Sequence, residues 1–359
     1  MFGWFRRRFV PSPPPEPIVS AVPRAPSPAS AFMPPPPPEP ESDAQRERAR
    51  EALRDQLRAR LAERVHALTA ELGRGAQADD VRALLHRLAH AEDRTLRPIP
   101  TAAQRALRLA RHPLANLQDV AEAFERDPSL AEGLLRMANS AWYRIGTSEV
   151  DSLHDALQRT GSAGAETVIM KHSLQGTLCR PGGACEAMTA QVWLHLTRTA
   201  AIARGLGRGF GIDPETAYLL GLMHDTGKLV LFDALSEHRR RTRTTAPLPF
   251  PLLRRMLHEL HEPLGGLALL RWGLDPALAE AVADHHRQGE VRTVNAAAEL
   301  LFVAERTDLA LATGASCDPE RWIHEGGLAL EARTLRGLCG HATDGALRFT
   351  EQEWLLPAV

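Results

Sequence analysis

The chain reads Leu219-Leu220-Gly221-Leu222-Met223-His224-Asp225-Thr226-Gly227-Lys228-Leu229-Val230-Leu231-Phe232, an apolar run that contains His224, Asp225 and Lys228. A helix that is apolar on nearly all sides is expected to be buried. A buried carboxylate is unfavourable unless a hydrogen bond, an ion pair or a metal compensates its charge. Adjacent side chains on a helix point about 100° apart, so His224 and Asp225 would meet only at an ion or ligand between them. The stretch therefore predicts a buried site for a divalent metal.

A second His-Asp pair, His154-Asp155, shows that the dipeptide alone is weak evidence. Ser152 and Asp155 have the spacing of a capping box, in which the two residues satisfy each other's backbone at the start of a helix. We interpret this pair as the polar first turn of a surface helix. The His224-Asp225 pair differs in its apolar flanks and in the Thr226-Gly227-Lys228 that follows. These neighbours favour a functional site at His224-Asp225.

The segment His224–Lys228 resembles the His-Asp-x-Gly-Lys signature of the HD superfamily of metal-dependent phosphohydrolases. Upstream stretches narrow the resemblance to the HDOD domain, an HD-related output domain of bacterial signalling proteins. These stretches are Ile99-Pro100, Asp127-Pro128-Ser129-Leu130 and, most specific, Leu134-Leu135-Arg136-Met137-Ala138-Asn139-Ser140. The resemblance covers the chain from Leu96 to Leu311 and implies an all-α fold, a multi-helix HD/HDOD bundle.

The composition is that of an ordinary globular chain. Of 359 residues, 44% are hydrophobic, and the net charge is −1 with a pI near 7.0, so no strong field would attract nucleic acid. The four cysteines match no zinc or redox spacing and are expected to be reduced. No run approaches the ~20 apolar residues of a membrane span, and no secretion signal is recognised. We expect a cytoplasmic protein without a nucleic-acid partner.

The N-terminal part divides into a tail and a helical hairpin. Residues 1–43 are rich in proline, which prevents them from forming a core and predicts a disordered tail. Residues 1–10 carry aromatic and arginine side chains that give at most weak contact with a membrane interface. Residues 44–94 repeat leucine and valine at steps of three and four, which is typical of amphipathic helices. The hairpin is expected to pack on the main domain or on a second chain, and the second arrangement would make a dimer.

The remaining chain is expected to hold one main domain and an extension. Residues 95–311 form the expected HDOD domain, with a front helical half at 95–180 and an HD-like half at 184–311. Helix starts of the Asp-Pro type recur in both halves, and no segment alternates with the period of a strand. The basic residues 239–245 precede a cluster of prolines and predict an exposed loop. Residues 312–359 predict a helical C-terminal extension.

The resemblance implies a set of metal ligands. In the HD superfamily, an upstream His, the His-Asp pair, further His residues and a final Asp hold the metals. The matching side chains here are His195, His224, Asp225, His261, His285, His286 and, at the final position, Glu305. Imidazole and carboxylate ligands together suit Mn, Fe, Zn or Ni. The resemblance also gives catalytic roles to Asp225 and to Lys228, whose charge would hold a phosphate.

Three differences from the family pattern count against catalysis. Glu305 stands where the last helix of an active member presents an Asp. Gln191 stands where the branch of the family that cleaves cyclic di-GMP often has a carboxylate. The residues after His286 are Arg287-Gln288-Gly289-Glu290 and not the Gly-Tyr-Pro loop of that branch. Hydrolysis of a cyclic dinucleotide is therefore disfavoured.

Two functions from different classes follow from these residues. HDOD domains commonly act without catalysis, so the favoured interpretation is a cytosolic regulatory protein of signal transduction that binds a signalling partner or a ligand. The alternative is a metal-dependent HD phosphohydrolase acting on a phosphomonoester or a cyclic nucleotide. An enzyme requires an open cleft above His224, whereas a regulatory domain tolerates a centre filled by the neighbouring Trp142-Tyr143 region.

Deleting residues 1–43 should leave the thermal midpoint of unfolding unchanged within error, because a proline-rich tail that forms no core contributes no buried surface. The measurement is thermal unfolding of the full and shortened chains, followed by circular dichroism. A loss of many degrees in the shortened chain would show that the tail packs on the folded part.

Overall fold

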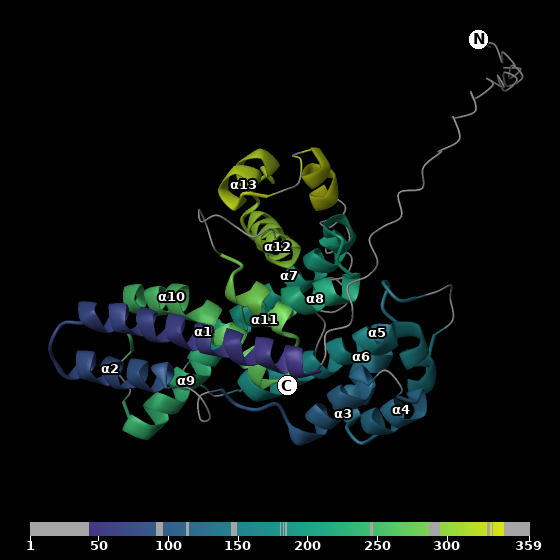
Figure 1. Cartoon of the computed structure of the whole chain (residues 1–359), viewed down its shortest axis with the longest axis horizontal. Coiled ribbons are helices and arrows are strands. Elements are labelled where there is room, and N and C mark those ends of the chain that lie inside the picture. Colours follow the sequence, from purple (N-terminus) through teal and green to yellow (C-terminus); the bar gives the residue numbers. More distant parts are fainter. Residues whose placement is uncertain are drawn as a thin grey trace, which may run out of the picture. The chain divides into compact units, whose positions relative to one another are not determined.

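Every regular element that the structure describes is a helix, which confirms the all-α prediction. The computed structural model describes residues 43–90, 96–112, 115–144, 149–179, 181, 183, 185–244, 247–286, 295–328, 331 and 333–340 (Figure 1). The predicted tail, apart from Asp43, and its proposed membrane contact at residues 1–10 lie outside these ranges. No helix within them is both long and apolar enough to cross a membrane.

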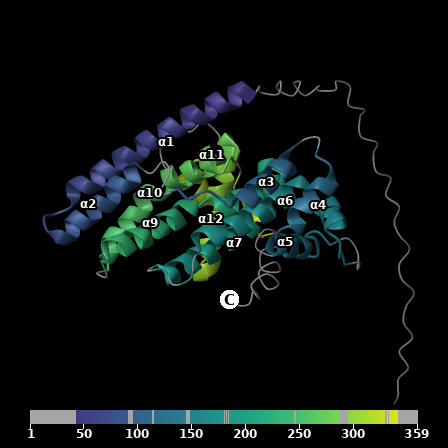
Figure 2. The same cartoon turned by 90° about the horizontal axis from the view of Figure 1, so that it is seen from below.

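The N-terminal hairpin consists of α1, Asp43–Glu71, and α2, Ala76–Ala89. Its apolar stripes are buried, and Leu57 at the centre of α1 is 0% exposed. Figures 1 and 2 show the hairpin lying along α9, Thr226–Thr242, and α10, Phe250–Arg271. The apolar stripe is thus covered by the chain itself, as in the first of the two arrangements expected. Pairing with a second chain stays a prediction.

Four helices form the front half of the domain. They are α3 (Thr101–Arg111), α4 (Leu117–Glu125), α5 (Pro128–Ala138) and α6 (Leu153–Leu178). Three of them begin at capping side chains, Asn116, Asp127 and Ser152, each of which accepts a hydrogen bond from a backbone N–H of the first turn. α6 is interrupted at Gly161, whose φ of 68° lies in the left-handed region. These caps explain why the sequence signals located the helix starts well.

The second half supplies the helices that surround the His224-Asp225 pair. They are α7 (Glu186–Leu206), the 3-10 turn η1 (Gly207–Phe210), α8 (Pro214–Met223), α9, α10, α11 (Pro276–Ala283) and α12 (Ala296–Thr313). The described part of the C-terminal extension contains α13, Pro319–Gly326, and helical residues 333–340. Residues 341–359 lie outside the described ranges.

The predicted loop at residues 239–245 is wrong for its first four residues. α9 continues to Thr242, and Arg243 ends it with a φ of 52°. Glu237 accepts hydrogen bonds from Arg240 and Arg241, one turn later on the same helix. Such pairs stabilise a helical turn, and arginines at a helix C-terminus also interact favourably with the helix dipole. The arginine run therefore extends the helix.

The His224-Asp225 pair stands at a break between two helices. α8 ends at Met223 and α9 begins at Thr226. Asp225 itself has φ −102° and ψ 16°, outside the regular helical region. The expectation of one continuous helix was wrong here. The turn removes the angular separation that a helix would impose, so both side chains face one volume.

Two glycines allow the neighbouring helices to approach this break. A Cβ on Gly227 would lie 1.8 Å from the carbonyl oxygen of His261, and a Cβ on Gly221 would lie 2.7 Å from the Cα of Ala200. Both distances are far below van der Waals contact, and both partners are backbone atoms. Only glycine therefore permits α9 to touch α10 and α8 to touch α7. These contacts place the break against the helices that carry the other candidate histidines.

Gly227→Ala should lower the free energy of unfolding by at least about 2 kcal/mol, because the added methyl group forces two backbones apart. Gly176→Ala is the matched control: Gly176 lies in α6, and a Cβ there meets nothing within 4 Å. Replacing a helical glycine by alanine in open space should stabilise by up to about 1 kcal/mol. Urea unfolding of the two variants measures both effects. Equal effects would contradict the role given to Gly227.

Candidate metal centre

Seven predicted side chains meet at the break between α8 and α9. They form two groups, and within each group the possible ligand atoms all lie within 4.8 Å of one another. The first group is Asp225, His261, His285 and His286, and the second is His195, His224, Asp225 and Glu305. Asp225 belongs to both groups. The structure thus brings together every residue that the sequence singled out, while their role as metal ligands stays a prediction.

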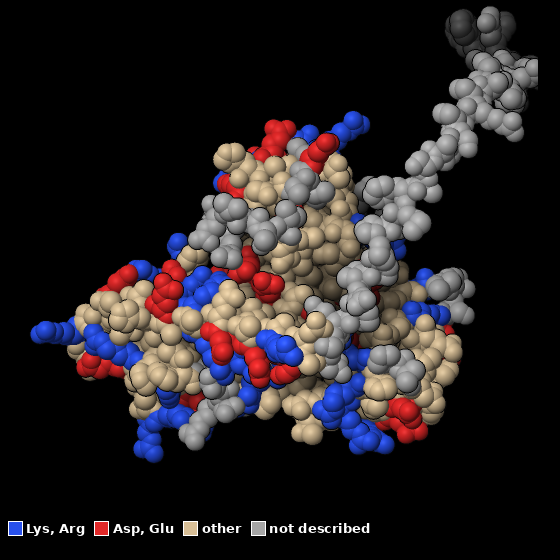
Figure 3. All heavy atoms as spheres, in the orientation of Figure 1, with Lys and Arg blue, Asp and Glu red and all other residues tan. Residues whose placement is uncertain are grey.

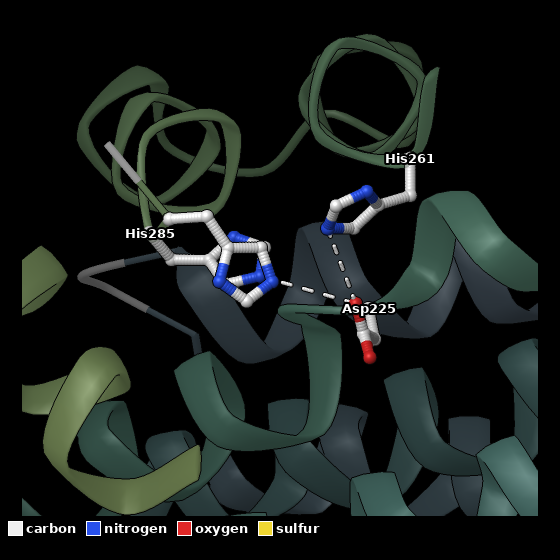
Figure 4. Close-up of side chains that lie close together, drawn as sticks. Asp225, His261 and His285 are labelled. Atoms are coloured by element: carbon white, nitrogen blue, oxygen red, sulfur yellow. Dashed lines mark ion pairs between the residues drawn. The ribbon is translucent and has the colours of Figure 1, made fainter. Parts of the chain in front are cut away.

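The ligand atoms come from separate parts of the chain. His195 lies on α7, His224 at the end of α8, His261 on α10, His285 and His286 after α11, and Glu305 on α12. Figure 4 shows His261 and His285 pointing from different segments toward Asp225. Their Nε2 atoms lie 3.6 Å and 3.9 Å from Asp225 Oδ1. The centre therefore exists only when these helices are packed together.

Backbone hydrogen bonds orient three of the imidazoles. The Nδ1 atoms of His224, His261 and His285 lie 2.8, 2.7 and 2.6 Å from carbonyl oxygens of the preceding turn. A carbonyl oxygen can only accept, so each Nδ1 carries the proton and donates it. The other nitrogen, Nε2, then presents a lone pair to the centre. This is the usual arrangement of a histidine that ligates a metal.

Three buried polar atoms in the first group have no hydrogen-bond partner in the described part of the chain. They are Asp225 Oδ1, His261 Nε2 and His285 Nε2. Buried polar atoms are nearly always satisfied, and each unsatisfied one is destabilising. All three are acceptors that face one another, so a cation placed among them compensates all three at once. The residues present therefore fit a divalent metal.

Burial sets the protonation of the imidazoles. It lowers the pKa of His224 to about 3 and holds the pKa of His261 and of His285 below the usual range. These histidines are neutral, which is the form that binds metals. Burial also opposes the charge of His195, but hydrogen bonds with Asp225 and Asp308 outweigh it and raise its pKa to about 9.

The two carboxylates of the centre have opposite pKa shifts. Burial opposes the charge of Asp225, but the positive charge of Lys228 outweighs it and holds the pKa well below its usual value. Lys228 donates a hydrogen bond to Asp225 Oδ2. For Glu305, burial and the charge of Asp225 together raise the pKa to about 7. Asp225 therefore stays negatively charged near neutral pH, whereas the charge of Glu305 depends on what the centre binds.

The centre has a buried floor and a partly exposed rim. The rim side chains are His195, Lys228, Glu305 and His286, with exposed fractions of 22%, 23%, 19% and 28%. The Trp142 and Tyr143 rings lie 5.4 Å and 5.5 Å from the guanidinium of Arg204. Both arrangements expected for the cleft above His224, open or filled by this region, stay predictions among the described residues. Residues 287–290, expected to follow His286 as an atypical loop, lie outside those residues.

Sequence reasoning missed two residues that hold His195. Asp308 is 2% exposed, and its Oδ2 lies 2.7 Å from His195 Nδ1. Arg198 donates hydrogen bonds of 2.7 Å and 3.0 Å to the two oxygens of the same carboxylate. Both residues follow a predicted ligand by one helical turn, Arg198 after His195 and Asp308 after Glu305. Helical spacing from the predicted ligands was the signal that could have found them.

The other His-Asp pair has the predicted surface role. Ser152 Oγ accepts a hydrogen bond of 3.1 Å from the Asp155 N–H and donates one of 2.8 Å to Asp155 Oδ2. Both bonds are exposed and belong to the first turn of α6. The surface helix start with Ser152 as its N-cap is confirmed, but Asp155 accepts its bond from the Ser152 hydroxyl and not, as in a full capping box, from the Ser152 backbone N–H. The same dipeptide serves two different purposes in this chain.

Comparison with known proteins gives a family match. Residues 96–288 match the HDOD domain, which is more than half of the chain. A curated relative, an uncharacterized protein from Treponema pallidum (strain Nichols), is 23% identical over 198 residues. The match takes in 52% of this chain and 37% of that protein, so the chain spans little more than a third of that relative's length.

Solved structures share the fold. A candidate phosphohydrolase from Shewanella amazonensis SB2B has a TM-score of 0.55 at 19% identity, covering 75% of this chain and 97% of that one. An HDOD domain protein of unknown function from Geobacter sulfurreducens has a TM-score of 0.53 at 18% identity, covering 76% of this chain and 98% of that one. A candidate signal transduction protein from Marinobacter aquaeolei VT8 has a TM-score of 0.54 at 20% identity, covering 82% of this chain and 66% of that one. These likenesses concern the fold alone; with the match over residues 96–288, the chain belongs to the HDOD domain family.

Proposed function

We propose that this chain is a signal-transduction protein whose centre binds two divalent cations and, next to them, a phosphate-bearing ligand. The observation that carries the proposal is the position of Asp225 in both ligand groups. A carboxylate has two oxygens and can bridge two cations, as in other two-metal sites. The unpartnered acceptor atoms of the first group supply the physical reason for the first cation.

Each position would have its own ligands. Asp225, His261, His285 and His286 would hold the first cation, and His195, His224, Asp225 and Glu305 the second. Divalent metals in such a site supply positive charge and Lewis acidity toward a phosphate. Lys228 stands on the rim beside the shared carboxylate. Its ammonium group would bind a phosphate oxygen by charge and so orient the ligand.

The proposed output is regulatory. The chain belongs to the HDOD family, and the similar Marinobacter protein is described as a candidate signal transduction protein. A domain of this kind would act on a signalling partner in the cytoplasm when its ligand binds. Gln191, which stands where a catalytic branch has a carboxylate, is exposed and belongs to neither ligand group. This favours binding over hydrolysis.

A phosphohydrolase is the second candidate, and the position of Glu305 favours it. Although longer than the aspartate of active members, Glu305 has a carboxylate oxygen within 4.8 Å of the possible ligand atoms of His195, His224 and Asp225. The Shewanella protein of similar fold is described as a candidate phosphohydrolase. The substitution at Glu305 therefore does not by itself remove the second cation, and catalysis needs a direct test.

The purified protein should take up divalent metal through His224 and Asp225 while hydrolysing cyclic di-GMP negligibly. Asp225→Ala should lose the metal from both positions, because it removes the shared ligand. Asp155→Ala is the matched control, since it changes the other His-Asp pair at the surface and should leave the metal content unchanged. Metal analysis of the three proteins gives the first readout. The second readout is the formation of linear dinucleotide or GMP from cyclic di-GMP, and of phosphate from simple phosphomonoesters, with Mn, Fe and Ni in turn.

Two results would change the conclusion. A metal content unaffected by Asp225→Ala would refute metal binding at the centre. Metal-dependent turnover that Asp225→Ala abolishes and Asp155→Ala spares would refute the proposal that the protein binds without hydrolysing its ligand. It would establish the protein as a phosphohydrolase.

Asp308→Asn should destabilise the metal-free protein more at pH 6 than at pH 10. The pKa of His195 is about 9, above the ordinary 6.5. The charged His195–Asp308 bond therefore contributes stability that is full below about pH 6.5 and is lost as the pH rises through about 9. We expect the two losses in unfolding free energy to differ by about 1 to 2 kcal/mol. Urea unfolding with EDTA measures this, and equal losses at both pH values would contradict it.

A further inference from the structure

The helix α1 lies outside the region that matches the HDOD domain, which begins at residue 96. Two of its arginines nevertheless reach the segments that carry the first group of ligands. Figures 1 and 2 show α1 running along α10 and beside α11. In the view of Figure 3, acidic and basic side chains alternate over this face. These arginines, Arg60 and Arg64, bind residues next to the candidate ligands and so hold the ligand segments in place.

Arg64 neutralises a buried carboxylate next to a ligand. Its two Nη atoms each lie 3.2 Å from Glu262 Oε2, and Nη1 also donates a hydrogen bond of 2.6 Å to the carbonyl oxygen of Glu259. Glu262 is 4% exposed and follows His261 directly. The other oxygen of Glu262 accepts a hydrogen bond of 3.0 Å from the backbone N–H of His286. One carboxylate thus joins α1 to the backbone of a ligand.

Arg60 holds the residues just before the paired histidines. Its Nη1 donates a hydrogen bond of 2.7 Å to Asp284 Oδ1, and its Nη2 donates one of 2.9 Å to the carbonyl oxygen of Ala283. Asp284 immediately precedes His285, and Ala283 ends α11. The same Nη2 lies 3.7 Å from Glu262 Oε2. Bonds between charged groups are stronger than neutral ones, so this turn is fixed from α1.

The approach of α1 is as close as side chains permit. Leu57 is 0% exposed, and a Cβ on Gly266 would lie 2.7 Å from Leu57 Cδ1. The arginine bonds are therefore made by a helix that is itself packed tightly on α10. If Arg64 is replaced while α1 stays packed, the Glu262 carboxylate remains buried beside His261 without its guanidinium partner, which is strongly unfavourable. The turn that carries His285 and His286 would then relax.

We propose that α1 is a positioning element of the first metal position, with Arg60 and Arg64 as positioning residues. The inference rests on the proposed function, since it concerns the same centre. Docking of the N-terminal hairpin and occupancy of this position are then linked, and by reciprocity each strengthens the other. A signal that displaces α1 would weaken metal binding by His261, His285 and His286. The hairpin would thus be the input of the protein.

The test is a titration of the metal-free full chain with Mn²⁺ by calorimetry. His286→Ala and Glu305→Ala assign the binding steps, because each removes a ligand of one position only. Arg60→Gln/Arg64→Gln should weaken the step that His286→Ala weakens by about 10- to 100-fold, as is typical for partners that orient metal ligands. The step that Glu305→Ala weakens should change by less than about threefold.

Arg50→Gln is the matched control. Arg50 lies on the same helix, its side chain is 20% exposed like that of Arg60, and it donates hydrogen bonds to the carbonyl oxygens of Leu270 and Leu274. The substitution therefore removes comparable bonds between α1 and the domain, but none of them involves a residue next to a candidate ligand. Neither binding step should change in this variant.

Hydrogen exchange gives a second readout that needs no arginine variant. Added Mn²⁺ should slow amide exchange along α1 in the wild type, and this slowing should disappear in His286→Ala. This arm decides the question even if the double arginine variant does not fold.

The outcomes separate the two proposals. A wild type without Mn²⁺ uptake overturns the proposed function and this inference with it. Uptake that the double variant leaves unchanged, or that Arg50→Gln weakens equally, overturns this inference alone. Exchange along α1 that does not respond to Mn²⁺ in a wild type that binds it has the same consequence.

Discussion

The structure depends on one buried charge, the carboxylate of Asp225. It is 0% exposed, and its pKa stays well below the usual value because Lys228 and the surrounding groups outweigh the effect of burial. A charge in this position must be compensated from several directions at once. The break between α8 and α9 and the close contact at Gly227 bring the compensating side chains near this carboxylate. The packing of the second half therefore follows from the need to surround this carboxylate.

The same arrangement of a carboxylate and an arginine occurs on two sides of Asp225. On one side, Asp308 lies between the ligand His195 and the guanidinium of Arg198. On the other, Glu262 lies between the backbone of His286 and the guanidinium of Arg64. In both cases a carboxylate is paired with an arginine and holds a candidate ligand in place. Where such partners orient metal ligands, their loss typically weakens metal affinity by about 10- to 100-fold.

The two sides differ in where the arginine originates, and this difference has functional meaning. Arg198 belongs to α7, inside the region that matches the HDOD domain, whereas Arg64 belongs to α1, outside it. A family fold can gain regulation when an added helix supplies one of the groups that complete its site. In this chain the added helix touches the side of the centre that contains His261 and His285, two buried candidate ligands.

The sequence by itself determined the helical class, the helix starts and the types of ligand, because caps, periodicity and motif spacing act over a few residues. It found His224 and Asp225 and, through the family order, the other candidate ligands, but it placed the pair on a continuous helix and residues 239–242 in a loop. Only the tertiary structure decided that Asp308 and Arg64 complete the centre. Arg64 and Glu262 are 198 residues apart, and no local pattern specifies which distant helices will meet. That choice is made by the packing of the whole bundle around Asp225.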